Sequence, residues 1–496
     1  MTLLNSLHGK FKIGLNVLVA ALFLYLVSTV LAKASTIGGP DFFFYVLNGR
    51  DLSEGNQLGI MRYLYFPGVY WVWRFAIDLL GKDLETLQNF YVGILILSAV
   101  LSSLCVYILS KKLIPALVTG SVYIALLHLL EGFGGCIEPI AAVTMLIGLT
   151  AYIYFAKKEK FWIATLIIIT FFALTLLMKQ QGLVFAVAAF VLVFYPTKRF
   201  FELHWLNFVV PPLIIATFLG LMFLEGGGIE AIKIAFGFAS AYIQIGTFDE
   251  NLSRFFKTIM PLVVIPLLVW LPFFVARILH ASHSLFVLAT RLTVFCIIAG
   301  GFSLYQFRIR DYLHYGIYTI PSLALLVGLS TAFIIETWGL LTFQQKKFYS
   351  WVAVSIFFYS NYLWRSELDK ISSQIQTGWG SPISYGQNRL SDICSRLTSR
   401  KVLILPPRAN EFHWVCDTTS GTGKWGYSWF DENPTYYIQL IENKYAKNVL
   451  LFDKKYGYFE NELLSRPAWV GIEAKLLQNG YREIYSSPFG HLYALP

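Results

Sequence analysis

The sequence predicts a polytopic α-helical membrane protein with a small α/β domain at its carboxyl end. Hydrophobic residues make up 56% of the 496 residues and charged residues only 14%, far below the roughly one-quarter charge of water-soluble domains. Apolar runs of about twenty residues, the length that a helix needs to cross the hydrocarbon core, recur along the chain. This pattern stops abruptly near Arg365. We therefore expect a membrane domain over residues 1–364 and a soluble domain over residues 365–496.

About eleven membrane spans are expected from the apolar runs. The first run extends from about Ile13 to Ala32, after the basic residues Lys10 and Lys12. An outer amphipathic loop over residues 33–90 follows it. The remaining runs are centred on residues 91–110, 113–130, 139–156, 161–177, 183–195, 206–224, 259–279, 292–306, 316–336 and 348–363.

The positions of Lys and Arg predict the orientation in the membrane. Basic clusters such as Lys111-Lys112 and Lys157-Lys158 occupy alternate loops, and cytoplasmic loops are the ones enriched in basic residues. The amino terminus is therefore expected in the cytoplasm, and an odd number of spans places the soluble domain outside. The net charge of +10 is interpreted as topology information. No basic patch interleaved with aromatic residues indicates nucleic-acid binding.

The soluble domain contains short strand-like and helix-like segments. Buried strands are predicted at residues 401–405 and 448–453, a helix at 467–479 closed by Gly480, and further strands at 481–486 and 491–495. The five cysteines have no CxxC spacing, so a zinc site is not indicated. Whether Cys394 and Cys416 form a disulfide stays open.

Polar residues collect at the outer ends of the predicted spans. Asp41 follows the first span, Glu138 the third and Lys179 the fifth, and the ninth span is followed by Arg308, Arg310, Asp311 and His314. Ionisable groups at the edge of apolar helices are costly unless they face a cavity or pair with each other. A cluster contributed by four separate hairpins therefore predicts one shared site.

Three segments carry short motifs. Asp41 follows Gly38-Gly39-Pro40 and starts an aromatic-rich stretch that is expected to lie in the interface. Phe66-Pro67 with Tyr70-Trp71 comes later in the same loop, and His314-Tyr315 precedes Pro321 near the tenth span. In their order the motifs resemble the GT-C class of membrane glycosyltransferases, which includes the protein O-mannosyltransferases and the aminoarabinose transferase of lipid A. Glu138-Pro139 resembles the second acidic position of this class, and Lys179-Gln180-Gln181-Gly182 its basic turn.

The resemblance implies a GT-C-like fold and a lipid-linked sugar donor. The expected donor is a polyprenyl-phosphate sugar, because nucleotide sugars are scarce outside the cytoplasm, and the expected acceptor is a glycan, a lipid or a protein. It implies a multi-pass protein of the bacterial inner (plasma) membrane that acts in glycan biosynthesis of the cell envelope. The absence of a dinucleotide-binding GxGxxG pattern agrees with such a donor. We expect no cofactor, and no HxxE or HxxH spacing supports a divalent metal.

A carboxylate at the membrane boundary can accept the proton of an acceptor nucleophile, and Asp41 is the candidate catalytic base of an inverting transfer. Fixed cations stabilise a departing lipid phosphate, a role that suits Lys179, Arg308 and Arg310. The candidate substrate-binding residues as a group are Glu138, Lys179, Arg308, Arg310, Asp311, His314 and Tyr315.

Each candidate also has a purely structural interpretation. Asp41 follows Pro40 as turn residues often do, Glu138 is placed to cap a helix, and Arg308 and Arg310 are placed to anchor a helix at the headgroups. The rival function is a polytopic transporter or lipid flippase, which would show internal repeats and polar groups near the midplane. No repeat is visible in the sequence, and the polar residues lie at one face.

Overall fold

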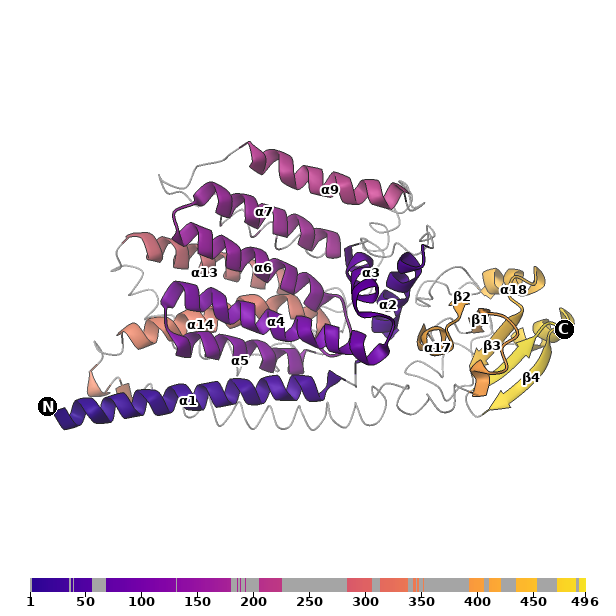
Figure 1. Cartoon of the computed structure of the whole chain (residues 1–496), viewed down its shortest axis with the longest axis horizontal. Coiled ribbons are helices and arrows are strands. Elements are labelled where there is room, and N and C mark those ends of the chain that lie inside the picture. The colour runs from indigo at the N-terminus through magenta and orange to yellow at the C-terminus, as the bar shows by residue number, and fades with distance from the viewer. Residues whose placement is uncertain are drawn as a thin grey trace.

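The computed structural model describes residues 2–34, 37–38, 40–55, 68–130, 132–179, 185, 188, 192, 205–224, 283–305, 313–337, 342–344, 346–347, 351, 392–405, 410–420, 434–452, 471–487 and 490–496. These residues form a helical bundle, two short helices at one end of it, and a mixed sheet beyond them (Figure 1). The short helices α2 and α3 lie between the bundle and the sheet.

The bundle is built from long apolar helices that pack side by side (Figure 1). α6 packs against α4 and α7, and α5 packs against α1, α4 and α14. The described helices are α1 (Thr2–Ala32), α4 (Leu84–Ser110), α5 (Leu113–Leu129), α6 (Glu138–Lys157), α7 (Phe161–Met178), α9 (Leu206–Leu224), α13 (His283–Tyr305) and α14 (Ile320–Thr337).

Within the described residues, four helical stretches are long and apolar enough to cross a membrane. They are Leu84–Ser110, Glu138–Lys157, Phe161–Met178 and Gly316–Glu336. Three shorter apolar helical stretches accompany them: Asn16–Ala32, Leu113–His128 and Arg291–Gly301. The expected run at residues 259–279 lies outside the described residues, and of the run at 348–363 only residue 351 is described.

α4 begins seven residues before the apolar run that predicts it, and a local cap explains the difference. The Asp83 carboxylate accepts hydrogen bonds from the backbone N–H and the hydroxyl of Thr86, both at 2.8 Å. An aspartate in extended conformation before a helix satisfies N–H groups that have no intrahelical partner. The helix therefore extends outward from the apolar run, to Leu84.

The segment expected to lie in the interface forms two helices, α2 (Pro40–Ser53) and α3 (Gly68–Leu80). α2 does not show the expected amphipathic pattern, because every residue from Phe42 to Leu52 is buried. α3 packs along α2, and the helix α17 (Asn410–Val415) of the soluble domain covers α2 as well. α2 is thus an enclosed element of the main core, which the bundle also forms.

The described part of the soluble domain contains a five-stranded sheet in the order β2-β1-β3-β5-β4. β1 (Lys401–Leu405) pairs in parallel with β2 (Thr419–Ser420) and β3 (Asn448–Phe452). β5 (Gly490–Ala494) pairs antiparallel with β3 and with β4 (Arg482–Ser487). The helices α18 (Pro434–Glu442) and α20 (Ile472–Gln478) complete it. Two apolar clusters on this sheet form separate small cores.

Candidate functional site

The site begins at the amino end of α2. Pro40 is the first residue of this helix and Asp41 lies in its first turn. A proline is tolerated there because it lacks an N–H that would have no intrahelical partner, and a carboxylate is favoured by the helix dipole. Asp41 is half-buried, whereas Phe42 and Phe43 directly after it are fully buried. The helix therefore presents its one first-turn carboxylate beside an apolar core.

The loop between α5 and α6 packs closely on this end of α2. Gly135 has a φ of +72°, and a Cβ atom at this position would run into the side chain of Phe42. The hydroxyl of Tyr91 on α4 donates to the carbonyls of Cys136 (2.9 Å) and Gly132 (3.1 Å). A residue without a side chain is thus required where the loop meets α2, and Tyr91 holds the loop in place.

Glu138 and Lys179 form a buried ion pair at the same end of the bundle. Glu138 is the first residue of α6 and Lys179 directly follows the last residue of α7. Nζ of Lys179 donates to Oε1 of Glu138, and their side chains are only 5% and 1% exposed. Burying either charge alone would be expensive, so each makes the burial of the other tolerable. The N-cap of α6 is the apolar Ile137, and the Glu138 carboxylate is directed to the lysine.

The buried thiol of Cys136 lies among all three charged groups. Its pKa is raised well above the usual value, first by burial and then by the negative charges of Glu138 and Asp41, while Lys179 acts in the opposite direction. Such electrostatic effects act over short distances. Asp41 directly precedes Phe42, whose side chain lies against Gly135, and Cys136 and Glu138 follow Gly135 within three residues. Asp41 and the Glu138–Lys179 pair therefore lie in one cluster at the same end of the bundle, although three separate segments contribute these residues.

Aromatic side chains line the inner side of the cluster. The ring of Trp73 on α3 lies edge-on to Phe42 at 5.2 Å between centroids and stacks on Tyr91 at 6.4 Å. The amino end of α3 meets the end of α7, where a Cβ atom on Gly68 would lie 2.7 Å from the carbonyl oxygen of Leu177. Tyr70 is buried in the same region. The preceding Phe66-Pro67 motif lies outside the described residues.

The late motif approaches the site through the 3₁₀ helix η7 (Leu313–Thr319), which contains His314 and Tyr315. This helix packs against α6, α13 and α14, and the ring of Tyr318 lies 5.5 Å from that of Phe185. The structure describes the backbone of His314 and Tyr315 but not their side chains. Arg308, Arg310 and Asp311 lie outside the described residues altogether.

The structure thus brings Asp41, Glu138 and Lys179 together and places the backbone of the late motif against α6. Among the described residues, no group of three or more His, Cys, Asp or Glu side chains is arranged to hold a metal ion. The arrangement offers a half-buried carboxylate next to a buried ion pair in surroundings that are mostly apolar. Such a site can accept a proton and can bind an anionic group.

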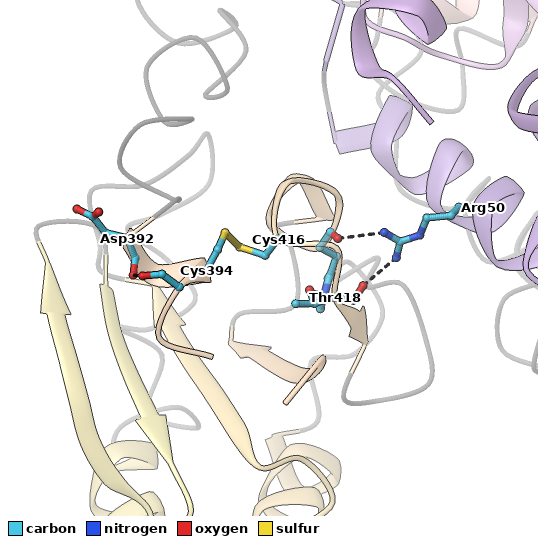
Figure 2. The surroundings of a disulfide bond; sticks show 7 residues. Arg50, Asp392, Cys394, Cys416 and Thr418 are labelled. Carbon is cyan, nitrogen blue, oxygen red and sulfur yellow. Dashed lines mark hydrogen bonds between the residues drawn. A yellow bond between two sulfur atoms is a disulfide. The ribbon is translucent and has the colours of Figure 1, made fainter. Parts of the chain in front are cut away.

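Two contributions escape sequence analysis because both depend on contacts between distant segments. Tyr91 is one tyrosine within a long apolar helix, and its role depends on the loop that it contacts. Arg50 on α2 reaches the soluble domain, where it donates to the carbonyls of His413 and Thr418 (Figure 2). A disulfide between Cys394 and Cys416, a pairing that the sequence leaves open, lies next to this contact.

No protein-family model matches the chain, and no curated protein matches it either. Among solved structures, the chain is similar to the crystal structure of ArnT from Cupriavidus metallidurans in the apo state. The likeness covers 97% of this chain and 98% of that chain, with a TM-score of 0.57 and 13% sequence identity. ArnT is an aminoarabinose transferase of the GT-C class. At so low an identity the likeness concerns the fold, and the chain has the fold of the GT-C class, as its sequence motifs predict.

Proposed function

We propose that the chain is an integral membrane glycosyltransferase that moves a sugar from a polyprenyl-phosphate carrier to a glycan, lipid or protein acceptor on the extracytoplasmic face. The observation that carries this proposal is the placement of Asp41 and of the Glu138–Lys179 pair at the same end of a bundle with a GT-C fold. Three segments that are separate in sequence supply these residues.

In the proposed reaction, a nucleophilic oxygen or nitrogen of the acceptor attacks the anomeric carbon of the donor sugar. The bond between that carbon and the phosphate oxygen breaks, and the polyprenyl phosphate leaves with the bonding electrons. Asp41 takes the proton of the acceptor as the new bond forms. A single displacement with one base inverts the configuration at the anomeric carbon.

Lys179, the cation of the described cluster, is proposed to bind the phosphate of the donor. Lys179 is buried at the end of α7, where apolar surroundings strengthen its attraction for an anion. Glu138 holds the ammonium group in place through their ion pair. Arg308 and Arg310 are proposed to serve the same phosphate, and Asp311, His314 and Tyr315 to bind substrate. A cation that gains attraction as the phosphate leaves lowers the barrier to transfer.

Two observations support an extracytoplasmic site. Among the described basic clusters, Lys111-Lys112 and Lys157-Lys158 lie at the end of the bundle opposite to α2, as expected of cytoplasmic loops. The disulfide between Cys394 and Cys416 lies in the soluble domain at the same end as the site, and disulfides persist in oxidising compartments. A reporter that is active only in the cytoplasm, fused after Pro496, is expected to be inactive. An active fusion would place the site on the cytoplasmic side and remove the case for this donor.

The transferase itself is tested with purified protein and a panel of polyprenyl-phosphate sugars, followed by mass analysis of candidate acceptors. Transfer of one sugar, with release of polyprenyl phosphate, is the expected result. Donor movement between the leaflets of a vesicle without release of the sugar would instead indicate the rival flippase. Nothing in the described structure favours that rival, because the charged cluster lies at an end of the bundle.

A further inference from the structure

One helix connects the candidate base to the soluble domain. α2 carries Asp41 in its first turn and Arg50 in its last turn. Arg50 is only 3% exposed, and its side chain leaves the membrane domain to enter the soluble domain (Figure 2). Buried arginines are rare and are normally paired.

The guanidinium group binds the carboxyl end of α17. Its Nη1 donates to the carbonyl of His413 at 3.2 Å and its Nη2 to the carbonyl of Thr418 at 2.8 Å. Nη1 also lies 3.5 Å from Oδ1 of Asp417, a residue with a φ of +48° just after the helix. The His413 carbonyl belongs to α17 and also accepts from the backbone N–H of Thr418 at 3.0 Å, and Thr418 lies three residues beyond the helix. A cation at the carboxyl end of a helix is favoured by the helix dipole. Arg50 thus acts as the cap of a helix in another domain.

The turn that receives Arg50 is itself fixed by several bonds. Cys416 within the turn is joined to Cys394 by the disulfide. Arg400 donates to the carbonyl of Asp417 at 2.9 Å, and the ring of His413 shares a hydrogen bond of 2.8 Å with the hydroxyl of Thr418. The carbonyls that accept from Arg50 therefore belong to a rigid part of the soluble domain.

We propose that Arg50 is a positioning residue for the transfer reaction: by capping the disulfide-bonded end of α17, it fixes the rotation and axial position of α2 and so the placement of Asp41. This inference rests on the proposed function, since it concerns the placement of the proposed base. It gives the soluble domain a role in the site although none of the residues that the structure describes there is part of the cluster around Cys136.

The physical reason lies in the difference between apolar and polar contacts. The residues from Phe42 to Leu47 are buried in the main core, and apolar burial is non-directional. Two hydrogen bonds from a planar guanidinium group constrain direction as well as distance. A misplacement of about 1 Å at a reacting group can lower the rate of reaction roughly 10²-fold. The polar contact of Arg50 can therefore fix the rotation and axial position of α2, which apolar burial alone does not fix.

The test uses the full chain in nanodiscs and compares Arg50→Ala with Arg50→Lys. The matched control is Arg74→Ala on α3, because Arg74 is an exposed arginine whose carboxylate partner is Asp78 on its own helix. Two quantities are measured: hydrogen exchange of the α2 amides, with α6 and α7 amides as internal reference, and kcat and donor KM for sugar transfer.

Arg50→Ala is expected to speed exchange of the α2 amides about tenfold or more, the change expected from losing hydrogen bonds to a charged donor. It should lower kcat roughly tenfold or more with donor KM unchanged. Arg50→Lys keeps the charge but loses the planar fork, so it should fall between Arg50→Ala and the unmodified protein. Arg74→Ala should match the unmodified protein in both measurements. If Arg50→Ala speeds exchange in α6 and α7 as well, α2 exchange and kcat are compared between Arg50→Lys and Arg74→Ala. Faster exchange and a lower kcat in Arg50→Lys alone support the positioning role, and equal values contradict it.

A second arm removes the disulfide with Cys394→Ser and Cys416→Ser together. Loosening the turn is expected to raise exchange of the α2 amides in the same direction as Arg50→Ala, and to add little when combined with it, because both changes act on one contact.

Unchanged α2 exchange in Arg50→Ala would overturn the positioning role, and so would faster exchange with an unchanged kcat. A complete lack of sugar transfer by the unmodified protein would be a different result, which contradicts the proposed function rather than the role of Arg50. The exchange measurements would then still show whether Arg50 holds α2.

Discussion

The ammonium group of Lys179 donates to the Glu138 carboxylate across two helix ends that are 41 residues apart in sequence, and both side chains are almost completely buried. One residue begins α6 and the other follows α7. The pair therefore ties together the two free ends of the α6–α7 hairpin, whose other ends are joined by a short basic loop.

The pair leads to a prediction about charge exchange. Glu138→Gln removes the carboxylate beside a buried ammonium group and should destabilise the protein by about 3 kcal/mol or more. Glu138→Lys with Lys179→Glu restores opposite charges and should recover a large part of this loss. Thermal unfolding in detergent measures both variants. Equal unfolding temperatures for the single variant and the unmodified protein would show that the pair contributes nothing to stability.

A second prediction concerns Asp41. Asp41→Asn keeps the size of the side chain but removes its negative charge and nearly all of its basicity. If the carboxylate takes the acceptor proton, turnover should fall roughly 10²-fold or more, while donor binding survives. Asp78→Asn is the matched control, because Asp78 is an exposed carboxylate on the adjacent helix α3. Near-native turnover in a well-folded Asp41→Asn protein would transfer the role of base to Glu138.

A third prediction separates close packing from backbone strain. Gly135 and Gly55 have similar φ angles of +72° and +76°, but a Cβ atom on Gly135 would meet Phe42 whereas one on Gly55 would meet nothing within 4 Å. Both alanine variants pay the cost of a left-handed backbone, about 1 kcal/mol. Gly135→Ala should be more destabilising by a further 1 to 3 kcal/mol or so, and it should lower turnover by displacing α2. Equal losses of stability would mean that the loop moves away from Phe42 without cost.

A fourth prediction concerns pH. The pKa of His413 is lowered to about 3, first by burial and then by the positive charge of Arg50. The unfolded residue titrates near 6.5, so between these values the unfolded state binds more protons than the folded state. The folded state is therefore fully stable above about pH 6.5 and loses stability as the pH falls toward 3, by up to about 1.4 kcal/mol per pH unit.

Trp414 fluorescence measured between pH 7.5 and pH 5 reports this loss of stability, because Trp414 packs against the main core and near Arg50 in the folded state. The other charged groups at the contact are Asp417 and Arg400. His413→Asn should abolish the pH dependence, whereas His491→Gln, an exposed histidine on β5, should leave it intact. A pH response that persists in His413→Asn would assign it to another group.

Several features of this protein follow from the sequence by itself, because they depend on neighbouring residues. The apolar runs at residues 139–156 and 161–177 coincide with α6 and α7, and the run at 91–110 lies within the longer α4. A helix forms over such a run because exposing backbone polar groups to lipid is costly. β1 and β3 fall on the expected short apolar runs. The order of the acidic, aromatic and basic motifs likewise predicts the GT-C fold that the structure shows.

The tertiary structure decides what these segments do together. No local pattern pairs Glu138 with Lys179, directs Arg50 to the turn after α17, or joins Cys394 to Cys416. Each of these contacts depends on which helix ends and loops the packed core brings within a few ångströms of each other. A charge is stable when buried only if its partner is already there, so the packing of distant segments selects the pairs. Local sequence places the ionisable residues at the helix ends, and the folded core determines their partners.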